Sequence, residues 1–269
     1  MPDLRRIAEE AARAGGAALA AHAGHITGLR TKSSAADVVT AADIASGVAV
    51  ARSIADALPN ARFVVEEPAV YALAGVVQGD LHDDEVWVVD PLDGTTSFVH
   101  SYPCYSVSVA CLRSGLPVAG AVFNVPAGEM ASAAADAGAS LDGRPLACTG
   151  ASRMSEALIA TGFPYDRGEP LDRQLRIFER VMRPSHDVRR DGSAAIDLAN
   201  VAIGRVDGFW ETGLKPWDMA AGVLIVAEAG GRVTDLEGSP WSVQTSCVVA
   251  ANPALHEVLL GLIMDADTA

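Results

Sequence analysis

Apolar residues recur at helical spacing in two runs near the start of the chain. The first run predicts a helix from Asp3 to about His22, and the second predicts a helix from about Ala41 to Leu58. Short β-prone runs follow at Phe63 to Val65 and at Val86 to Val89. A longer β-rich stretch, from Tyr105 to about Leu146, is interrupted by glycines and prolines that mark turns. The first half of the chain therefore predicts helices packed on an antiparallel or mixed sheet.

The second half has a different order of elements, because predicted strands and helices alternate along it. This alternation is typical of an α/β arrangement. We expect an N-terminal half (1–150) and a C-terminal half (151–269) that form one compact unit, with a site at their junction. The predicted elements are a strand at Leu158 to Thr161, helices at Leu171 to Met182 and Ala194 to Ile203, a strand at Asp207 to Trp210, a helix at Trp217 to Ala229, a strand at Cys247 to Ala250 and a closing helix.

Composition favours a globular protein outside the membrane. The chain has 269 residues, half of them apolar, which is enough to form a large hydrophobic core that needs no disulfide cross-links. No apolar run approaches the roughly 18 residues that a membrane helix needs. Charged residues are spread through Met1 to Gly24, so this segment predicts an amphipathic helix rather than a cleavable signal. We therefore expect a cytoplasmic protein.

Charge and cysteine content exclude several further classes. The 34 acidic residues outnumber the 20 basic ones, and the formal net charge of −14 argues against general nucleic-acid binding. Such a chain would also repel a phosphorylated substrate unless cations intervened. The cysteines form no C-x-x-C pair, so buried thiols are expected rather than zinc or redox sites. They are Cys104, Cys111, Cys148 and Cys247.

The stretch Trp87 to Thr96 brings carboxylates, hydroxyls and a glycine turn to the end of one predicted strand. Pro91 is expected to stop strand pairing, and the turn after it lets Asp90 and Asp93 converge. Hard oxygen ligands beside anion donors indicate magnesium that holds a phosphoryl group. An ordinary Asp-Gly turn capped by threonines is the alternative. The expected anion donors are Gly94, Thr95 and Thr96.

A second polar segment, Glu211 to Asp218, lies between a predicted strand and a predicted helix. Pro216 suits the first turn of that helix, and Asp218 follows within the same turn. An acidic residue at this position also simply complements the helix dipole.

Further acidic positions have equally ordinary alternatives. Glu66 and Glu67 follow a predicted strand, where they are either solvated surface charges or neighbours whose repulsion a cation relieves. Asp43 could be only a dipole partner of its helix, and the segment at Lys32 could be a polar loop.

Taken together, these fragments resemble the inositol monophosphatase family of magnesium-dependent, lithium-sensitive phosphatases. The resemblance extends over almost the whole chain. It is carried by the segments Lys32 to Ser34, Asp37 to Asp43, Glu66 to Glu67, Trp87 to His100, Gly192 to Ala195, Glu211 to Gly222 and Glu228 to Gly231. The departures are mild: Pro68 stands where many members carry serine, and Ser97 and Ser101 stand where Asn and Gly are frequent.

The resemblance implies a fold, partners and site residues. The fold would be the layered αβαβα sandwich of the sugar phosphatases, in a mixed α+β and α/β chain that forms a homodimer. About two or three Mg²⁺ ions would be bound, with Mn²⁺ as a possible replacement and Li⁺ as an inhibitor. The metal ligands would be Glu66, Asp90, the carbonyl of Leu92, Asp93 and Asp218. The catalytic group would comprise Asp43 and Thr95, which orient the attacking water, and Glu67. Substrate would be bound by Lys32, Gly94, Thr95, Thr96, Gly192, Ser193, Ala194 and Glu211.

The implied activity is hydrolysis of a small phosphomonoester, with inositol 1-phosphate as the expected substrate. Histidinol phosphate, fructose 1,6-bisphosphate and nucleotide 3′-phosphates are substrates of other family members and stay open. So does a role as an interaction protein of the transcription machinery, because a bacterial branch of the family resembles this chain. The acidic run Asp80 to Glu85 is either a mobile flap over the metals or a solvated loop.

Overall fold

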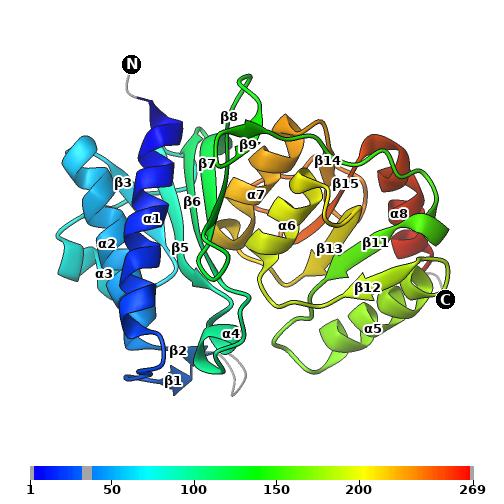
Figure 1. Cartoon of the computed structure of the whole chain (residues 1–269), viewed down its shortest axis with the longest axis horizontal. Coiled ribbons are helices and arrows are strands. Elements are labelled where there is room, and N and C mark those ends of the chain that lie inside the picture. Colours follow the sequence, from blue (N-terminus) through cyan, green and yellow to red (C-terminus); the bar gives the residue numbers. More distant parts are fainter. Residues whose placement is uncertain (1–2, 32–37, 267–269) are drawn as a thin grey trace.

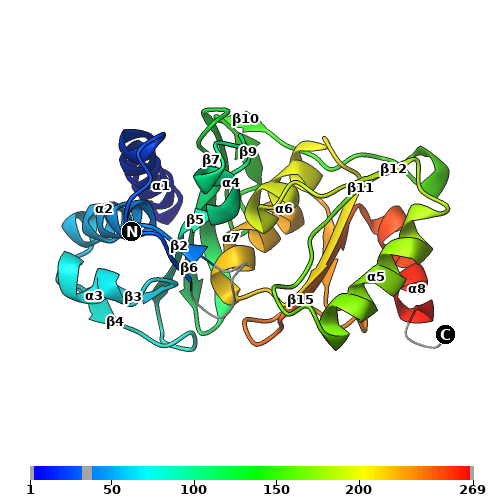
Figure 2. The ribbon, with the colours of Figure 1, turned by 90° about the horizontal axis from the view of Figure 1, so that it is seen from below.

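Helices and sheets alternate in five layers along the longest axis of the molecule (Figures 1 and 2). The computed structural model describes residues 3–31 and 38–266. Helices α1 and α2 cover the outer face of an eight-stranded sheet, and α6 and α7 lie between it and a five-stranded sheet. Helices α5 and α8 form the last layer. The layered αβαβα sandwich expected from the sequence is therefore confirmed.

The first layer contains α1 (Leu4–His22), α2 (Ala41–Ala57) and the short α3 (Ala69–Ala74). The side chain of Asp3 accepts a 3.1 Å hydrogen bond from the Arg6 amide and so caps α1. Helices α1 and α2 pack closely: a Cβ on Gly15 would lie 2.7 Å from a side-chain carbon of Val50. Both predicted helices are confirmed, whereas α3 is too short to leave a periodic pattern.

The eight-stranded sheet is mixed, as expected. Its strands follow the order β10-β9-β8-β7-β6-β5-β3-β4. Strands β3, β4 and β5 run parallel, and the other pairs are antiparallel. The bounds are β3 (Arg62–Val65), β4 (Val77–Gln78), β5 (Val86–Asp93), β6 (Ser106–Arg113), β7 (Leu116–Asn124), β8 (Glu129–Ala134), β9 (Ala139–Leu141) and β10 (Arg144–Pro145). Strands β1 (Arg30–Thr31) and β2 (Val38–Val39) form a small separate sheet.

Strand β5 does not end at Pro91, which corrects the sequence-based expectation. Asp90 pairs with Ser108 and Asp93 pairs with Ser106, so three steps on β5 match two steps on β6. The extra residue is accommodated as a bulge, where a proline is tolerated in a sheet. The strand therefore continues past Pro91, and the bulge sets the directions of the two carboxylates. The short helix α4 (Thr95–Val99) follows directly.

The middle layer joins the two sheets. Helix α7 (Pro216–Glu228) packs against β6 and β7, while α6 (Ala194–Ile203) contacts β11 and β13 of the second sheet. A Cβ on Gly120 of β7 would lie 2.9 Å from the Cα of Ala221, so glycine is needed for this close approach. The interface between the halves is thus tightly packed.

The second sheet has the order β12-β11-β13-β15-β14. Helix α5 (Glu169–Met182) and helix α8 (Pro253–Asp265) pack on its outer side. The α/β character predicted for this half is confirmed, and β12 and β14 are short additions. The remaining bounds are η1 (Met154–Glu156), β11 (Leu158–Thr161), β12 (Asp187–Arg189), β13 (Gly208–Thr212), β14 (Arg232–Thr234) and β15 (Cys247–Ala251).

Two further expectations can be compared with the structure. All four cysteines are free thiols, of which Cys104 and Cys111 are buried and the other two are half-buried. In the acidic run Asp80 to Glu85, Asp83 and Glu85 each form a 2.9 Å ion pair with an arginine of the first sheet. The run is fastened to the sheet, which does not support the flap interpretation. Across the described ranges, no helix combines the length and apolar character that crossing a bilayer requires.

Candidate active site

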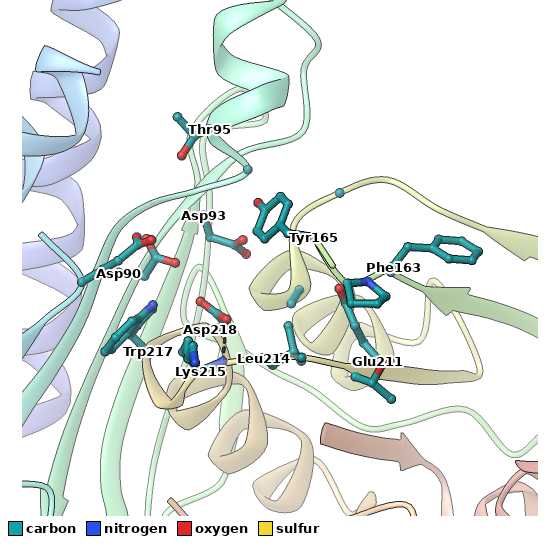
Figure 3. A pocket seen from close by; sticks show the side chains of 18 of the residues that line it. Asp90, Asp93, Thr95, Phe163, Tyr165, Glu211, Leu214, Lys215, Trp217 and Asp218 are labelled. Atoms are coloured by element: carbon teal, nitrogen blue, oxygen red, sulfur yellow. Dashed lines mark hydrogen bonds between the residues drawn. The ribbon is translucent and has the colours of Figure 1, made fainter. Parts of the chain in front are cut away.

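A cavity of about 510 Å³ lies where residues of the two halves meet (Figure 3). Strand β5 contributes acidic residues from one side, and the start of α7 contributes another from the opposite side. In Figure 3, Asp90, Asp93 and Asp218 point toward a common space, and Glu211 lies farther along the wall. The carboxylates that line the cavity are Glu66, Asp90, Asp93, Asp166, Glu211 and Asp218.

Asp90 is held at the bulge of β5. Its Oδ1 accepts a 2.9 Å hydrogen bond from the amide of Leu92, and the side chain is 2% exposed. The Ser46 hydroxyl donates to the carbonyl oxygen of Pro91 at 2.7 Å, which anchors the turn to α2. These bonds orient the Asp90 carboxylate toward the cavity.

Asp93 is bound by the second half of the chain. Its Oδ2 accepts a 2.6 Å hydrogen bond from the hydroxyl of Ser193 and a 2.8 Å bond from the amide of Ala195. Ser193 is the N-cap residue of α6 and is buried. Its side chain therefore lies behind the cavity wall, contrary to the substrate contact expected for it. Gly192 and Ala194, the two neighbours of Ser193, do line the cavity.

Asp218 both caps its helix and lines the cavity. Its Oδ2 accepts a 2.8 Å hydrogen bond from the amide of Lys215, so it caps the first turn of α7. The same carboxyl group lines the cavity and is within hydrogen-bonding reach of Asp90. A capping role and a place in the acidic cluster are thus compatible.

The acidic cluster is electrostatically unfavourable without a cation. Burial, followed by the charges of Glu66, Asp93 and Asp218, raises the pKa of Asp90 well above its usual value. Burial and the charge of Asp93 likewise raise the pKa of Asp218. Like charges that share a site disfavour one another's ionisation. A divalent cation would relieve this repulsion, and carboxylate oxygens are the ligands that magnesium prefers.

The donor set therefore fits magnesium in its chemistry. As the side chains stand, no three His, Cys, Asp or Glu residues of 3–31 and 38–266 are close enough together to enclose an ion. Asp93 and Asp218 are instead hydrogen bonded to backbone amides and to a serine. The predicted ligands face one cavity, and their side chains would have to turn to bind an ion.

Asp43 and Thr95 form a buried pair beside the cavity. The Thr95 hydroxyl lies 3.1 Å from Asp43 Oδ1 and 3.1 Å from the carbonyl oxygen of Leu92. A hydroxyl has one proton, so it donates to one of these oxygens at a time and keeps lone pairs that can accept. Thr40 donates to Asp43 Oδ2 through its amide at 2.8 Å and its hydroxyl at 2.6 Å. Asp43 is fully buried, and this burial raises its pKa.

Gly94 connects these groups at the turn between β5 and α4. It has φ = 94°, in the left-handed region, and a Cβ there would lie 2.8 Å from the carbonyl oxygen of Cys104. Only glycine fits both conditions. Gly94 and Thr95 line the main cavity, whereas Thr96 lines a neighbouring one.

Glu211 lies in the cavity wall beside a glycine that the sequence did not single out. A Cβ on Gly162 would overlap the Glu211 carboxylate, so the glycine leaves the space that this side chain occupies. Burial, with the charges of Asp93 and Asp218, raises the pKa of Glu211 to about 8. A lone glycine after a strand resembles any turn residue, and for this reason sequence reasoning missed Gly162.

Two predicted residues remain. Glu67 is buried and does not line the cavity, although its charge contributes to the raised pKa of Asp43. Lys32 lies outside the described residues.

The layered fold and the acidic cavity are those expected for the sugar-phosphatase fold. Comparison with known families agrees, because the model of the "Inositol monophosphatase family" matches residues 2–267. The chain belongs to the inositol monophosphatase family. Members of this family are phosphatases and are generally metal-dependent.

Individual relatives carry two kinds of name. The inositol-1-monophosphatase of Synechocystis sp. is 39% identical over 253 residues, which cover 94% of this chain and 86% of the relative. The Nus factor SuhB of Escherichia coli is 37% identical over 229 residues, which cover 85% of this chain and 83% of the relative. The structure of inositol monophosphatase from Anabaena (Nostoc) sp. superposes with a TM-score of 0.85 at 37% identity, over 97% of this chain and 95% of the other.

Proposed function

We propose that the protein is a magnesium-dependent phosphomonoester hydrolase and that inositol 1-phosphate is its preferred substrate. The convergence of Asp90, Asp93 and Asp218 from both halves on one cavity carries this proposal. It is supported by family membership and by the similarity to the inositol-1-monophosphatase of Synechocystis sp..

The metal ligands in this proposal come from the two halves of the chain. About two or three magnesium ions would be held by Glu66, Asp90, the Leu92 carbonyl, Asp93 and Asp218. Bound magnesium lowers the pKa of a water molecule and neutralises charge on the phosphoryl oxygens. Mn²⁺ is expected to substitute, and Li⁺ is expected to inhibit.

The chain's own groups position the reactants. The Thr95 hydroxyl would donate a hydrogen bond to Asp43 Oδ1 and so be oriented to accept a hydrogen bond from the attacking water. Asp43 fixes that orientation, because Thr40 holds its other oxygen through two hydrogen bonds. Positioning of this kind reduces the entropy cost of the reaction. No covalent intermediate on the protein is needed. Glu67 would act through its charge on Asp43.

The remaining groups would bind the substrate. The amides of Gly94, Thr95 and Thr96 would hold the phosphate, and Lys32 would supply a positive charge near it. Glu211 would meet a hydroxyl of the alcohol part, with the backbone at Gly192 and Ala194 beside it. Ser193 would act from behind the wall by orienting Asp93.

Phosphate release from inositol 1-phosphate, histidinol phosphate and fructose 1,6-bisphosphate, each with and without magnesium, tests this function. We expect magnesium-dependent release with inositol 1-phosphate as the best substrate. A preference of about ten-fold or more for histidinol phosphate, equivalent to roughly 1.4 kcal/mol, would overturn the substrate assignment. The absence of metal-stimulated release from every monoester would overturn the function.

Similarity to the Nus factor SuhB of Escherichia coli favours a second, compatible role in contact with the transcription machinery. The net charge of −14 disfavours direct binding to nucleic acid, so the partner would be a protein. We further propose a homodimer, which light scattering of the purified protein tests. A monomer at micromolar concentration would contradict it.

A further inference from the structure

Gln174 is a polar residue on the buried face of α5, and its side chain is fully buried. Its Nε2 donates two hydrogen bonds to the end of β11, one of 2.7 Å to the carbonyl oxygen of Gly162 and one of 3.0 Å to the hydroxyl of Thr161. A side-chain amide has two N–H donors, so both are used here. The reverse orientation of the amide would place two carbonyl oxygens against each other at Gly162, which fixes the assignment of its nitrogen.

The oxygen of the same amide is left without a donor. Gln174 Oε1 is buried, and none of the described residues donates a hydrogen bond to it. An unpaired buried acceptor costs about as much free energy as a hydrogen bond contributes, so this amide adds little to the stability of the fold. The effect of its two hydrogen bonds is instead to fix the position of Gly162.

The position of Gly162 in turn determines the space that is left for Glu211. A Cβ on Gly162 would overlap the Glu211 carboxylate, so the two residues are in direct contact. No residue within 3–31 or 38–266 donates a hydrogen bond to this carboxylate, which its surroundings influence through burial and charge. The position of Glu211 therefore depends on its contact with Gly162.

A second path connects Gln174 to the strand that carries Glu211. The hydroxyl of Thr161 accepts the hydrogen bond from Gln174 and lies 2.8 Å from the carbonyl oxygen of Trp210, to which it donates. Trp210 directly precedes Glu211 on β13. The amide of Gln174 thus acts on both strands that meet at this wall of the cavity.

The segment after Gly162 is also held by α5. The rings of Phe163 and Phe178 contact each other, with their centroids 5.9 Å apart. Phe178 lies four residues after Gln174, so both side chains lie on the same face of the helix. In Figure 3, Phe163 lies on the same side of the pocket as Glu211. Helix α5 therefore fastens the backbone on both sides of Gly162.

We infer that Gln174 is a positioning residue for substrate recognition: it holds Gly162 in place and thereby keeps Glu211 where it can bind a hydroxyl of the alcohol part of the substrate. This inference rests on the proposed function, in which Glu211 meets that hydroxyl. Gln174 does not line the cavity, so its effect on the substrate passes through Glu211.

A double-mutant cycle of Gln174→Met and Glu211→Gln, measured as kcat/KM for inositol 1-phosphate in magnesium, tests the inference. Methionine keeps the length of the side chain and removes both N–H donors. In the wild-type background, Gln174→Met should lower kcat/KM by about five-fold or more, mainly through KM. In the Glu211→Gln background the same change should have no further effect, because the group that Gln174 positions has already been altered.

Two controls separate positioning from a general loss of structure. The substrate 4-nitrophenyl phosphate has no hydroxyl on its alcohol part, so Gln174→Met should leave its kcat/KM unchanged. Val181→Ala is the matched control on the same helix, because Val181 is buried about two turns further along α5. It should lower the melting temperature by weakening the packing of α5, and it should leave the KM for inositol 1-phosphate unchanged.

Three results would overturn the inference. They are an equal loss of kcat/KM in both backgrounds, an equal loss for both substrates, and an unchanged KM for inositol 1-phosphate in a folded Gln174→Met protein. Should Gln174→Met fail to fold, Gln174→Leu removes the same donors with a different shape, and the same outcomes apply to it.

Crystal structures of the wild type and of Gln174→Met separate this inference from the proposed function, because they require no turnover. The Glu211 carboxylate should leave its place beside Gly162 in the variant. An unmoved carboxylate would overturn the inference even in an active phosphatase. A displaced carboxylate in a protein that hydrolyses no phosphomonoester would mean that only the proposed function has failed.

Discussion

The hydroxyl of Ser193 donates a 2.6 Å hydrogen bond to Oδ2 of Asp93, which lies 100 positions earlier in the chain. The bond connects the N-cap of α6 to the last residue of β5. A residue that starts a helix in one half of the molecule thus orients a carboxylate of the other half. The site depends on this junction as much as on its acidic residues.

Ser193→Ala should weaken both the helix and the site. It removes a helix N-cap and one of the two hydrogen bonds to Asp93 Oδ2, at a cost of about 1 kcal/mol in the free energy of unfolding. Phosphate release should fall, because Asp93 loses its orientation. Denaturant unfolding and the assay with inositol 1-phosphate measure the two effects. Ser193→Thr keeps the hydroxyl and should retain most activity; an equally large loss in that variant would contradict the hydrogen-bond argument.

Asp93→Asn should abolish turnover and leave the fold intact. The change removes one of the repelling charges around Asp90 and Asp218, so metal-free stability should not fall. Circular dichroism and thermal unfolding check the fold, and phosphate release checks activity. Full activity in this variant would remove Asp93 from the site.

Gly162→Ala tests the placement of Glu211. The added methyl group would displace the Glu211 carboxylate, which we propose binds a substrate hydroxyl. We expect kcat/KM for inositol 1-phosphate to fall by about ten-fold, mainly through KM, with the fold retained. Gly150→Ala is the matched control, because a Cβ there would have no neighbour within 4 Å. Similar kinetics in the two variants would show that Glu211 does not contact the substrate.

Metal-free stability should decrease as the pH rises. Burial raises the pKa of Glu211 to about 8, so this group keeps its proton in the folded state at pH values where the unfolded chain has lost it. Between about pH 5 and pH 8 the folded state therefore binds more protons, and the free energy of unfolding falls with pH. Calorimetry in chelator should show a melting temperature lower by roughly 5 °C at the upper end of this range.

Two comparisons identify the groups responsible for this dependence. Magnesium should raise the melting temperature most at high pH, because it binds the ionised carboxylates. Glu211→Gln should reduce the pH dependence and leave the part that Asp90 and Asp218 contribute, whereas Glu237→Gln, at an exposed position, should not change it. Metal-free stability that increases from pH 5 to pH 8 would contradict the raised pKa values.

The long helices could be predicted from the sequence. Helices α1 and α2 each bury one apolar face, and α7 buries an apolar run, so each leaves a recognisable pattern of apolar residues. Short elements could not. Strand β4 has two residues and β12 has three, too few to show a period. They form because neighbouring strands offer them backbone partners, which is information that a local pattern lacks.

The candidate site was likewise predictable from the sequence only in part. The residue types and spacing at Asp90 and Asp93 predicted a shared acidic site, and both residues line the cavity. The role of Ser193 could not be predicted, because a serine before a helix is an ordinary cap and only the tertiary structure brings Asp93 to it. Pro91 was expected to end its strand, but the neighbouring strand β6 accommodates a bulge there. No local sequence pattern marks Gly162 as a residue of the site.

The contact between Gly120 of β7 and Ala221 of α7 also bears on how activity arises during refolding. Asp218 lies three residues before Ala221 on the same helix, so it reaches Asp90 only once that helix has docked on the first sheet. Neither half should gather the full set of carboxylates by itself. Enzymatic activity should therefore recover later than secondary structure when the denatured chain is diluted into buffer.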